Sequence, residues 1–584
     1  MAIEDFHEPL VGMNEPEGTP VGRVRAPQGT TGYSFITRDT DRVRIGEFVY
    51  YSVSDDSGKE RWVLGRVTGR EAVREYPVSY LSLVEIAPED ILRSIGSEDF
   101  TPLFDVEVTI IGYHDKTFGF VNPRLPPHQG TMVCLASDDH LKAVLGSGER
   151  GQGNALIGYL LNRPGNRVPL SIDVGEVVSK HLAVLAATGS GKSYTVGVLL
   201  EELMGTHNRA AVLVLDPHSE YATLAEMGNL TDNPLVGNRV GFISTSKSTS
   251  DGYLPTVKVI TEEDIKVRYV DLESADWAGI LKDASDKMLN ILHESLRRLG
   301  KRGGMTGLEG ETGRSDSGTR SGTGRNVFGF ADIMAELEAV RDDNNSMSID
   351  GLRWRLRAHA RKKIFSTGEY TPLREMLRPG QLTIIDMSEL EEGHQQLIAS
   401  LLLRKILQAR IKTKKDKVTD GEFHLPYPVF IVLEEAHRFA PASGESRAKR
   451  VLKTILSEGR KFGVGTCLVS QRPGKLDSDI LSQCMTQIIM KIINPSDQEN
   501  IKQSVEAVTA DLLDELPSLT TGQAVVVGSA INTPVTVRIR ERYTRPGGSS
   551  SNAPREWREY QESGMRREEQ EQAPVTRNRD RELF

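Results

Sequence analysis

The 584-residue sequence contains only three cysteines, Cys134, Cys467 and Cys484. Their number is odd and they lie far apart, which excludes a disulfide framework and the paired spacing of zinc ligands. This usage fits a reducing compartment, and we expect a cytoplasmic protein.

The chain also lacks long apolar runs and an excess of basic charge. No uninterrupted apolar segment approaches the roughly 18 residues that cross a bilayer, and the acidic start MAIEDFHEPL does not have the regions of a signal peptide. We therefore expect no membrane attachment. Because the formal net charge is −9, contact with nucleic acid must come from a local basic patch or from an oligomeric channel.

The N-terminal part reads as a small β-barrel. After a flexible start, residues 1–20, short runs such as GEFVYYSV, RWVLGRV, DVEVTIIGY and GTMVCLA recur between turn residues over 21–170. Short strands at this spacing are typical of a barrel.

The following region predicts an α/β fold. Apolar strands that begin near residues 182, 210, 239, 382, 428, 463 and 486 alternate with helical segments. Such runs predict a central parallel sheet covered on both faces. The sheet would be built from two parts of the chain, 171–261 and 373–544.

Two segments depart from this alternation. Residues 262–372 carry helical periodicity and predict a helical insertion, within which the glycine-rich stretch 300–326 is expected to be a disordered loop. The charged tail, 545–584, has little aliphatic content, so it is expected to be disordered alone or to fold against a partner subunit.

The stretch LAATGSGKSYTVGVLL, residues 185–200, predicts a phosphate-binding loop between a strand and a helix. Backbone N–H groups converge at such a turn, Lys192 would reach the β and γ phosphates of ATP, and the Ser193 hydroxyl would be a ligand of Mg²⁺. The first glycine of the usual pattern is replaced by Ala186, and a chance glycine turn is the alternative. The predicted nucleotide-binding residues are Thr188, Gly189, Ser190, Gly191, Lys192, Ser193 and Tyr194.

A second strand, PVFIVLEEAHRFAP, ends in two carboxylates. Glu434 would hold Mg²⁺ through a water molecule, and Glu435 would orient or deprotonate the attacking water. The alternative is a pair of solvated carboxylates at a helix N-terminus, where the helix dipole favours them.

Two more strand ends carry polar groups. VLVLDPHSEY ends in Asp216, His218 and Glu220, and TCLVSQRP contains Gln471. The carboxyl ends of parallel strands share one edge, so Gln471 could contact the γ-phosphate or the attacking water, unless it caps the next turn. We interpret His218 as a hydrogen-bonding histidine rather than a metal ligand.

Five motifs together carry a family resemblance: ATGSGKS at 187–193, DPHSEY at 216–221, LEEAHRF at 433–439, SEGRKFG at 457–463 and VSQRP at 469–473. Over residues 21–540 the chain resembles the HerA family of DNA translocases in the FtsK-HerA superfamily. The resemblance implies a HAS-barrel-like N-terminal domain, a RecA-like motor with a helical insertion, and a homo-hexameric ring around double-stranded DNA. It also implies a partner, a NurA-type nuclease or another effector, for which the barrel is the expected docking surface.

The resemblance further assigns residues that would act on a neighbouring subunit. Arg460 matches the arginine finger of the family, with Lys461 as a second candidate, and Lys180 could also reach across. A guanidinium from a neighbour would compensate charge in the transition state of phosphoryl transfer. The alternative for Arg460 and Lys461 is a solvated helix end.

Basic residues that could contact DNA in a ring channel are Arg447, Lys449, Arg450 and Lys475. Contacts of this kind are independent of sequence and sensitive to salt. Ordinary solvated charge is an equally good interpretation of each residue.

These observations predict an ATP- and Mg²⁺-dependent hexameric motor that translocates on double-stranded DNA, with helicase activity as an extension, acting with a nuclease in DNA end processing. Two alternatives stay open: a conjugation- or secretion-type DNA pump, and a nucleotide-dependent ring scaffold that activates an effector in phage defence.

Overall fold

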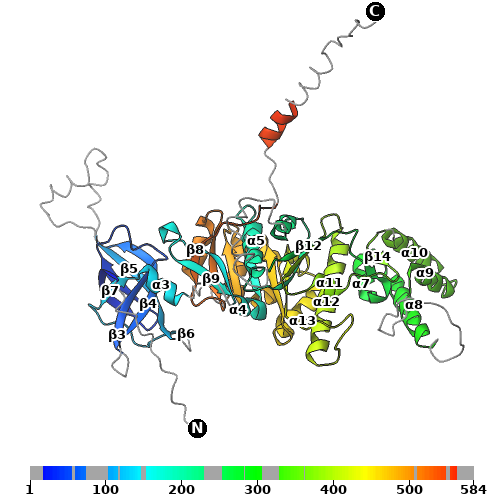
Figure 1. The fold of residues 1–584 in the computed structure, drawn as a ribbon, viewed down its shortest axis with the longest axis horizontal. Helices are drawn as coiled ribbons and strands as arrows, with labels where there is room; N and C mark the ends of the chain where they lie inside the picture. The colour runs from blue at the N-terminus through cyan, green and yellow to red at the C-terminus, as the bar shows by residue number, and fades with distance from the viewer. Residues whose placement is uncertain are drawn as a thin grey trace, which may run out of the picture.

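The computed structural model describes residues 18–54, 60–73, 103–115, 119–145, 153–228, 253–281, 283–305, 328–360, 362–505, 509–547 and 553–561. A barrel, a central α/β body and a helical lobe lie in a row along the molecule (Figure 1). Several expectations fall outside the described residues: those for 1–17, the strand near 239, 306–326 and 562–584.

Six of the first seven strands close into the predicted barrel. These six occur in the order β2-β1-β7-β3-β4-β5, and β2 pairs with β5 to close the sheet, while β6 lies beside β5 as a seventh strand. Alternate side chains such as Tyr33, Phe35 and Val108 fill the interior. The bounds are β1 Thr19–Gln28, β2 Gly32–Thr37, β3 Phe48–Ser54, β4 Glu60–Ala72, β5 Phe104–Asp115, β6 Gly119–Val121 and β7 Met132–Leu135.

The central body holds an 11-stranded sheet in the order β12-β15-β11-β16-β17-β10-β18-β19-β20-β8-β9. Strands β12 to β18 of this order are parallel, and the last four continue it antiparallel. The bounds are β8 Asn154–Leu160, β9 Pro169–Asp173, β10 Leu182–Leu185, β11 Ala211–Asp216, β12 Thr256–Ile260, β15 Gln381–Asp386, β16 Val429–Leu433, β17 Val464–Ser470, β18 Thr486–Met490, β19 Gln523–Gly528 and β20 Val535–Ile539.

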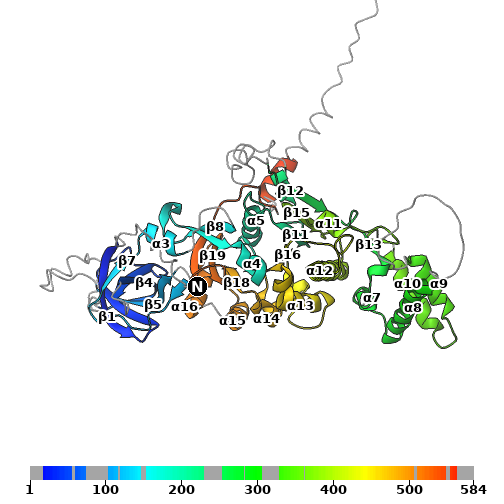
Figure 2. The same cartoon turned by 60° about the horizontal axis from the view of Figure 1, so that its bottom comes forward.

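Helices cover both faces of this sheet, as the continuous apolar runs predict. In Figure 2, α5 (Lys192–Leu203) lies above strands β11 and β16, and α12 (Glu392–Lys414) and α13 (Arg447–Phe462) lie below them. Successive residues of β10 point to opposite faces, so Val184 packs in the core with α5 and Leu185 in the core with α12 and α13. The predicted α/β motor with a central parallel sheet is confirmed.

Short helices complete the body: α3 Asp138–Val144, η1 Pro164–Asn166, α4 Val174–Lys180, η2 Ala222–Gly228, α11 Leu373–Met376, η4 Ala436–Arg438, η5 Pro473–Lys475, α14 Ser478–Ser482, α15 Pro495–Ser504, α16 Ala510–Glu515 and η6 Leu516–Ser518. Among the described residues no helix is long and apolar enough to cross a membrane.

The barrel is shorter than the sequence predicts. Strands β8 and β9, expected within 21–170, join the motor sheet, where β8 pairs antiparallel with β20. Ala155 and Ile157 of β8 pack into the core beneath α5. The misassignment has a simple cause, because a short apolar strand reads the same in the sequence whether it joins a barrel or an open sheet. At the opposite edge, β12 is a strand that the sequence pattern did not identify.

The helical insertion is confirmed as a lobe with its own core around Trp277 and Leu352. Its elements are β13 Val267–Arg268, η3 Tyr269–Asp271, α7 Ser274–Ile280, α8 Asp286–Met305, α9 Phe330–Ala339, α10 Ser346–Ala360 and β14 Phe365–Ser366. Helix α8 continues to Met305, so the first residues of the expected disordered loop are helical. Each residue that extends an existing helix adds a hydrogen bond, which offsets the cost of glycine, about 1 kcal/mol.

The start of the C-terminal tail is also ordered against the body. The Arg545 Nε lies 2.5 Å from Glu226 Oε1, and residues 553–561 form a helix that projects from the molecule (Figure 1). Trp557 and Tyr560 of this helix are exposed. The described part of the tail is therefore ordered, while residues 562–584, which carry most of the expectation for this segment, lie outside the described residues.

Candidate nucleotide-binding and catalytic site

The predicted phosphate loop lies between the end of β10 and the start of α5. Gly189 and Gly191 have φ angles of 78° and 101°, in the left-handed region that favours glycine. The loop is closed by hydrogen bonds from Ser190 N and Oγ to Ala187 O, of 3.2 and 2.6 Å. Gly522 N also donates to Ser190 O at 3.1 Å, so the turn before β19 supports the loop from the side.

The start of α5 suits an anion. The N–H groups of Lys192, Ser193 and Tyr194 have no acceptor within the helix, and the helix dipole places partial positive charge there. The Lys192 side chain is only 4% exposed, so its ammonium is held inside the site rather than in solvent. These residues fit the phosphates of a nucleotide.

Both carboxylates of the second motif contact the loop lysine. Lys192 Nζ donates to Glu434 Oε1 and, at 2.7 Å, to Glu435 Oε1. Neighbouring residues of a strand point to opposite faces, but β16 ends at Leu433, and Glu435, two residues later, has a φ of 51°. This left-handed turn lets two successive side chains reach the same ammonium.

Burial gives the two carboxylates different properties. Glu434 is fully buried, which raises its pKa to about 7 although Lys192 counteracts the shift. For Glu435, the effect of burial is outweighed by the His437 ring, 3.2 Å from its Oε2, and by the charge of Lys192, which together lower its pKa to about 2. Glu435 is therefore ionised at neutral pH.

The turn after β11 adds two contacts to the site. Tyr221 donates its hydroxyl hydrogen to Glu434 Oε2, and the Ser193 hydroxyl donates to Glu220 Oε2. Asp216 holds this turn by accepting the N–H of His218 at 3.2 Å and of Tyr221 at 3.0 Å. The proposed metal ligand Ser193 therefore has a carboxylate beside it.

Gln471 lies at the edge of the loop. The Thr188 hydroxyl donates to Gln471 Oε1 at 2.8 Å. A polar pocket of about 710 Å³ opens beside this pair, with Arg472, Lys475 and Asn500 among its lining residues. The amide is thus held next to the phosphate loop rather than folded onto its own turn.

Two histidines bracket the acidic pair. Nδ1 of His437 lies 3.2 Å from Glu435 Oε2 and 3.3 Å from Ser470 Oγ. His218 Nε2 accepts a hydrogen bond of 3.0 Å from Arg438. The interpretation of His218 as a hydrogen-bonding residue agrees with this contact.

Three predicted site residues lie away from the others. Arg460 and Lys461 are exposed at the end of α13, just before β17, and Lys180 ends α4, just before β10. Lys180 Nζ pairs with Glu176 at 2.5 Å. The phosphate loop follows the carboxyl end of β10, whereas these cations lie at the amino ends of β17 and β10. The seven residues of β17 span roughly 20 Å, so the cations are far from the phosphate loop of their own chain.

The proposed DNA-contacting cations divide into two groups. Arg447 pairs with Asp276 and, at 2.6 Å, with Glu273, and the buried Lys449 Nζ lies 2.8 Å from Asp477. These two residues form ion pairs that join segments of the chain, so neither is a simple solvated cation. Arg450 and Lys475 are exposed.

Sequence reasoning missed the roles of Tyr221 and His437 in the site. Both lie within a few residues of a strand end that already supplies a predicted site residue. The available signal was position: polar side chains in the turn after a parallel strand lie on the shared edge.

A strand, a left-handed glycine loop, a buried lysine and an acidic pair after another parallel strand of the same sheet define a P-loop ATPase of the RecA-like class. Residues 155–406 match the family model described as "Helicase HerA, central domain". The DNA double-strand break repair helicase HerA of Pyrococcus furiosus is 32% identical over 554 residues, which cover 89% of this chain and 92% of the relative. The chain therefore belongs to the HerA helicase family.

A second relative gives a similar result. A probable helicase of Methanocaldococcus jannaschii is 32% identical over 439 residues, covering 74% of this chain and 75% of the relative. Among solved structures, VirB4 of Thermoanaerobacter pseudethanolicus covers 67% of this chain and 96% of its own, with 14% identity and a TM-score of 0.45.

Proposed function

We propose that this chain is an ATP-driven motor that translocates on double-stranded DNA and acts with a nuclease in DNA end processing. The names of the relatives as DNA double-strand break repair helicases support a role on DNA. The observation that carries the proposal is the contact of Lys192 with Glu434 and Glu435, because it joins the phosphate loop to a general base.

Each residue has a distinct role in hydrolysis. Lys192 and the N–H groups at the start of α5 bind the phosphates, while Ser193 and Glu434 would hold magnesium, with Glu220 beside them. Bound magnesium neutralises charge on the phosphate oxygens. Glu435 takes a proton from the attacking water as its oxygen bonds to the γ-phosphorus and the bond to the ADP oxygen breaks.

Residues at the carboxyl ends and at the amino ends of the strands would together complete a site between two subunits. Gln471, held by Thr188, orients the water or the γ-phosphate. Arg460, Lys461 and Lys180 lie too far from the phosphate loop of their own chain, so in a ring they would serve the neighbouring subunit. A guanidinium supplied in this way stabilises transition-state charge. The ring thus couples hydrolysis to subunit contact.

DNA binding would come from repetition of exposed cations. Arg450 and Lys475 would each appear six times in a hexameric channel, which creates local positive charge in a protein of net charge −9. Such binding weakens steeply with salt.

The decisive experiment measures ATP hydrolysis by the purified full-length protein with and without duplex DNA. We expect duplex DNA to raise the rate, and Lys192→Ala to abolish both rates because the phosphates lose their cation. Arg297→Ala, at an exposed side chain of α8, serves as the control. A rate that DNA does not change would favour the scaffold alternative, and normal hydrolysis by Lys192→Ala would refute the site.

A further inference from the structure

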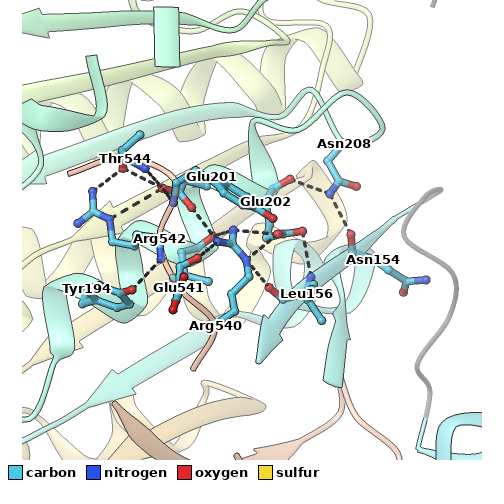
Figure 3. Close-up of polar contacts among 12 residues, drawn as sticks. Asn154, Leu156, Tyr194, Glu201, Glu202, Asn208, Arg540, Glu541, Arg542 and Thr544 are labelled. Atoms are coloured by element: carbon cyan, nitrogen blue, oxygen red, sulfur yellow. Dashed lines mark hydrogen bonds and ion pairs between the residues drawn. The ribbon is translucent and has the colours of Figure 1, made fainter. Parts of the chain in front are cut away.

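A buried segment of the chain crosses the helix that carries the phosphate loop. Residues 540–544, here called the strap, follow β20 and pack along α5 (Figure 3). Arg540, Arg542 and Thr544 are each at most 6% exposed. Neither the catalytic residues nor the DNA candidates described above include this segment.

One end of the strap is fixed by a buried ion cluster. Arg540 lies between Glu201 and Glu202 of α5, with N–O distances of 2.9 and 2.8 Å, and both glutamates are fully buried. Glu202 Oε2 also accepts the N–H of Leu156 at 3.0 Å, and Arg540 Nε donates to Leu156 O at 3.1 Å. The cluster therefore ties together α5, β8 and the strap.

Glu201 fixes the other end of the strap. Its Oε1 accepts the N–H groups of Tyr543 and Thr544, at 2.9 and 2.8 Å, and the Thr544 hydroxyl at 2.8 Å. A buried ion cluster rarely adds more stability than apolar packing would. We therefore interpret this cluster as one that fixes the position of the strap on α5.

The strap reaches the first turn of α5. The N–H of Arg542 donates to the Tyr194 hydroxyl at 2.7 Å. The guanidinium of Arg542 lies over Gly197, where an added Cβ would fall 2.5 Å from its Cζ, so a larger residue here would displace the guanidinium. Tyr194 follows Ser193 directly and is half-buried.

The direction of a bound nucleotide follows from the catalytic groups. Lys192 reaches the β and γ phosphates, and Glu435 and Gln471 lie on the γ side. The nucleoside must then extend beyond the N–H groups of Ser193 and Tyr194. Helical side chains tilt toward the helix N-terminus, which places the Tyr194 ring on that side of the loop.

We propose that Tyr194 and the strap form the nucleoside-binding side of the nucleotide site, with Arg540 as the positioning residue that holds the strap in place. The aromatic ring would contact the ribose and base, and the hydrogen bond from Arg542 sets the direction of its hydroxyl. This inference rests on the proposed function, because it extends the same nucleotide site.

The test compares two ligands that share the phosphates but differ in the nucleoside. Calorimetry of the full-length protein with Mg²⁺ would measure the dissociation constants of ATP and of inorganic tripolyphosphate. We expect Tyr194→Ala to weaken ATP about tenfold, equivalent to about 1.4 kcal/mol, and to change tripolyphosphate less than about threefold. Arg540→Met should act in the same direction, and Arg540→Lys should restore part of the ATP affinity. Arg545→Met, at a side chain that is 75% exposed, is the matched control and should change neither constant.

Each outcome has a defined meaning. If Tyr194→Ala weakens both ligands equally or neither, the nucleoside assignment is wrong while the phosphate loop stands. If the unmodified protein binds ATP no more tightly than tripolyphosphate, the nucleoside side is also refuted. If it binds neither ligand, the proposed function itself fails. Because Tyr194→Ala leaves the ion cluster intact, the test does not depend on Arg540 variants folding.

Discussion

Helix α5 carries a buried cluster of one cation and two neighbouring glutamates at each end. At its start, Lys192 contacts Glu434 and Glu435, and at its end, Arg540 contacts Glu201 and Glu202. Both clusters are almost completely removed from solvent. Their composition is nearly the same, but their surroundings differ.

The difference lies in how the carboxylates are satisfied. Glu201 and Glu202 accept backbone N–H groups from the strap and from β8, so the Arg540 cluster is saturated. In the Lys192 cluster, Glu435 Oε2 accepts no hydrogen bond of good geometry, although His437 lies near it. Lysine is also a flexible point charge, whereas arginine fits two carboxylates with a planar fork. Saturated groups hold structure, and incompletely saturated groups are available for chemistry.

We expect the largest effect from a substitution in the Lys192 cluster. Glu435→Gln keeps the shape of the side chain but cannot accept a proton, so we expect ATP hydrolysis to fall about a thousandfold, within the usual range for a lost general base. ATP binding should persist because Lys192 and the loop remain. Phosphate release and calorimetry would measure the two properties separately. Hydrolysis within about threefold of the unmodified rate would show that Glu435 is not the base.

We expect the next largest effect from a substitution in the Arg540 cluster. Arg540→Met leaves two glutamates buried without a cation, and removing one partner of a buried ion cluster costs about 3 kcal/mol or more. Urea unfolding followed by circular dichroism would detect the loss of unfolding free energy. The Arg545→Met control should change stability by less than about 0.5 kcal/mol, since that ion pair is exposed. Equal stability of both variants would contradict a structural role for the cluster.

A third prediction contrasts these charged clusters with the neutral ring of His181, just before β10. Burial lowers the pKa of His181 to about 4 from its ordinary 6.5, and its Nδ1 accepts the N–H of Thr466 at 3.2 Å. At pH values between 4 and 6.5 the unfolded chain binds more protons at this histidine than the folded chain does. The contribution of His181 to the free energy of unfolding is therefore complete above pH 6.5 and falls as the pH drops toward 4.

We expect a loss of about 2 kcal/mol attributable to this group between pH 7 and pH 5, measured by urea unfolding. His181 has a φ of 63°, so His181→Asn is the suitable comparison, because asparagine tolerates this backbone conformation. The variant should show a pH dependence smaller by that amount. An unchanged pH dependence would exclude His181 as its source.

The smallest expected effect concerns the hydrogen bond from Tyr221 to Glu434 in the Lys192 cluster. Tyr221→Phe removes the hydroxyl that donates to Glu434 but keeps the ring in the core. The hydrogen bond contributes about 1 kcal/mol, so we expect hydrolysis to fall about fivefold with little change in ATP affinity. Steady-state kinetics would separate kcat from KM. A rise in KM alone would place Tyr221 in nucleotide binding instead.

Much of the motor could be predicted because its signals are local. The glycine loop before α5, the apolar runs of the strands and the polar residues that follow them specify a phosphate site on one edge of a parallel sheet. The rule that strand ends share an edge placed Glu434, Glu435 and Gln471 near Lys192. The helical lobe was equally visible from its periodicity.

The unpredicted parts depend on contacts between distant segments. The short apolar run of β8 does not show which sheet the strand joins, and its antiparallel pairing with β20 places it in the motor sheet. Lys449 reads as a solvated cation until the fold places Asp477 beside it. Arg460 and Lys180 lie on helices that lead into the amino ends of β17 and β10, so they are far from the phosphate loop at the carboxyl ends of the strands.

The fold class, the phosphate loop and the acidic pair follow from local sequence signals, because backbone conformation and hydrophobic periodicity are encoded by neighbouring residues. Only the tertiary structure decided that Arg540 meets Glu201 and Glu202, which lie more than 300 positions earlier. Burial makes such charges seek one another, but their partners are chosen by the packing of the whole chain.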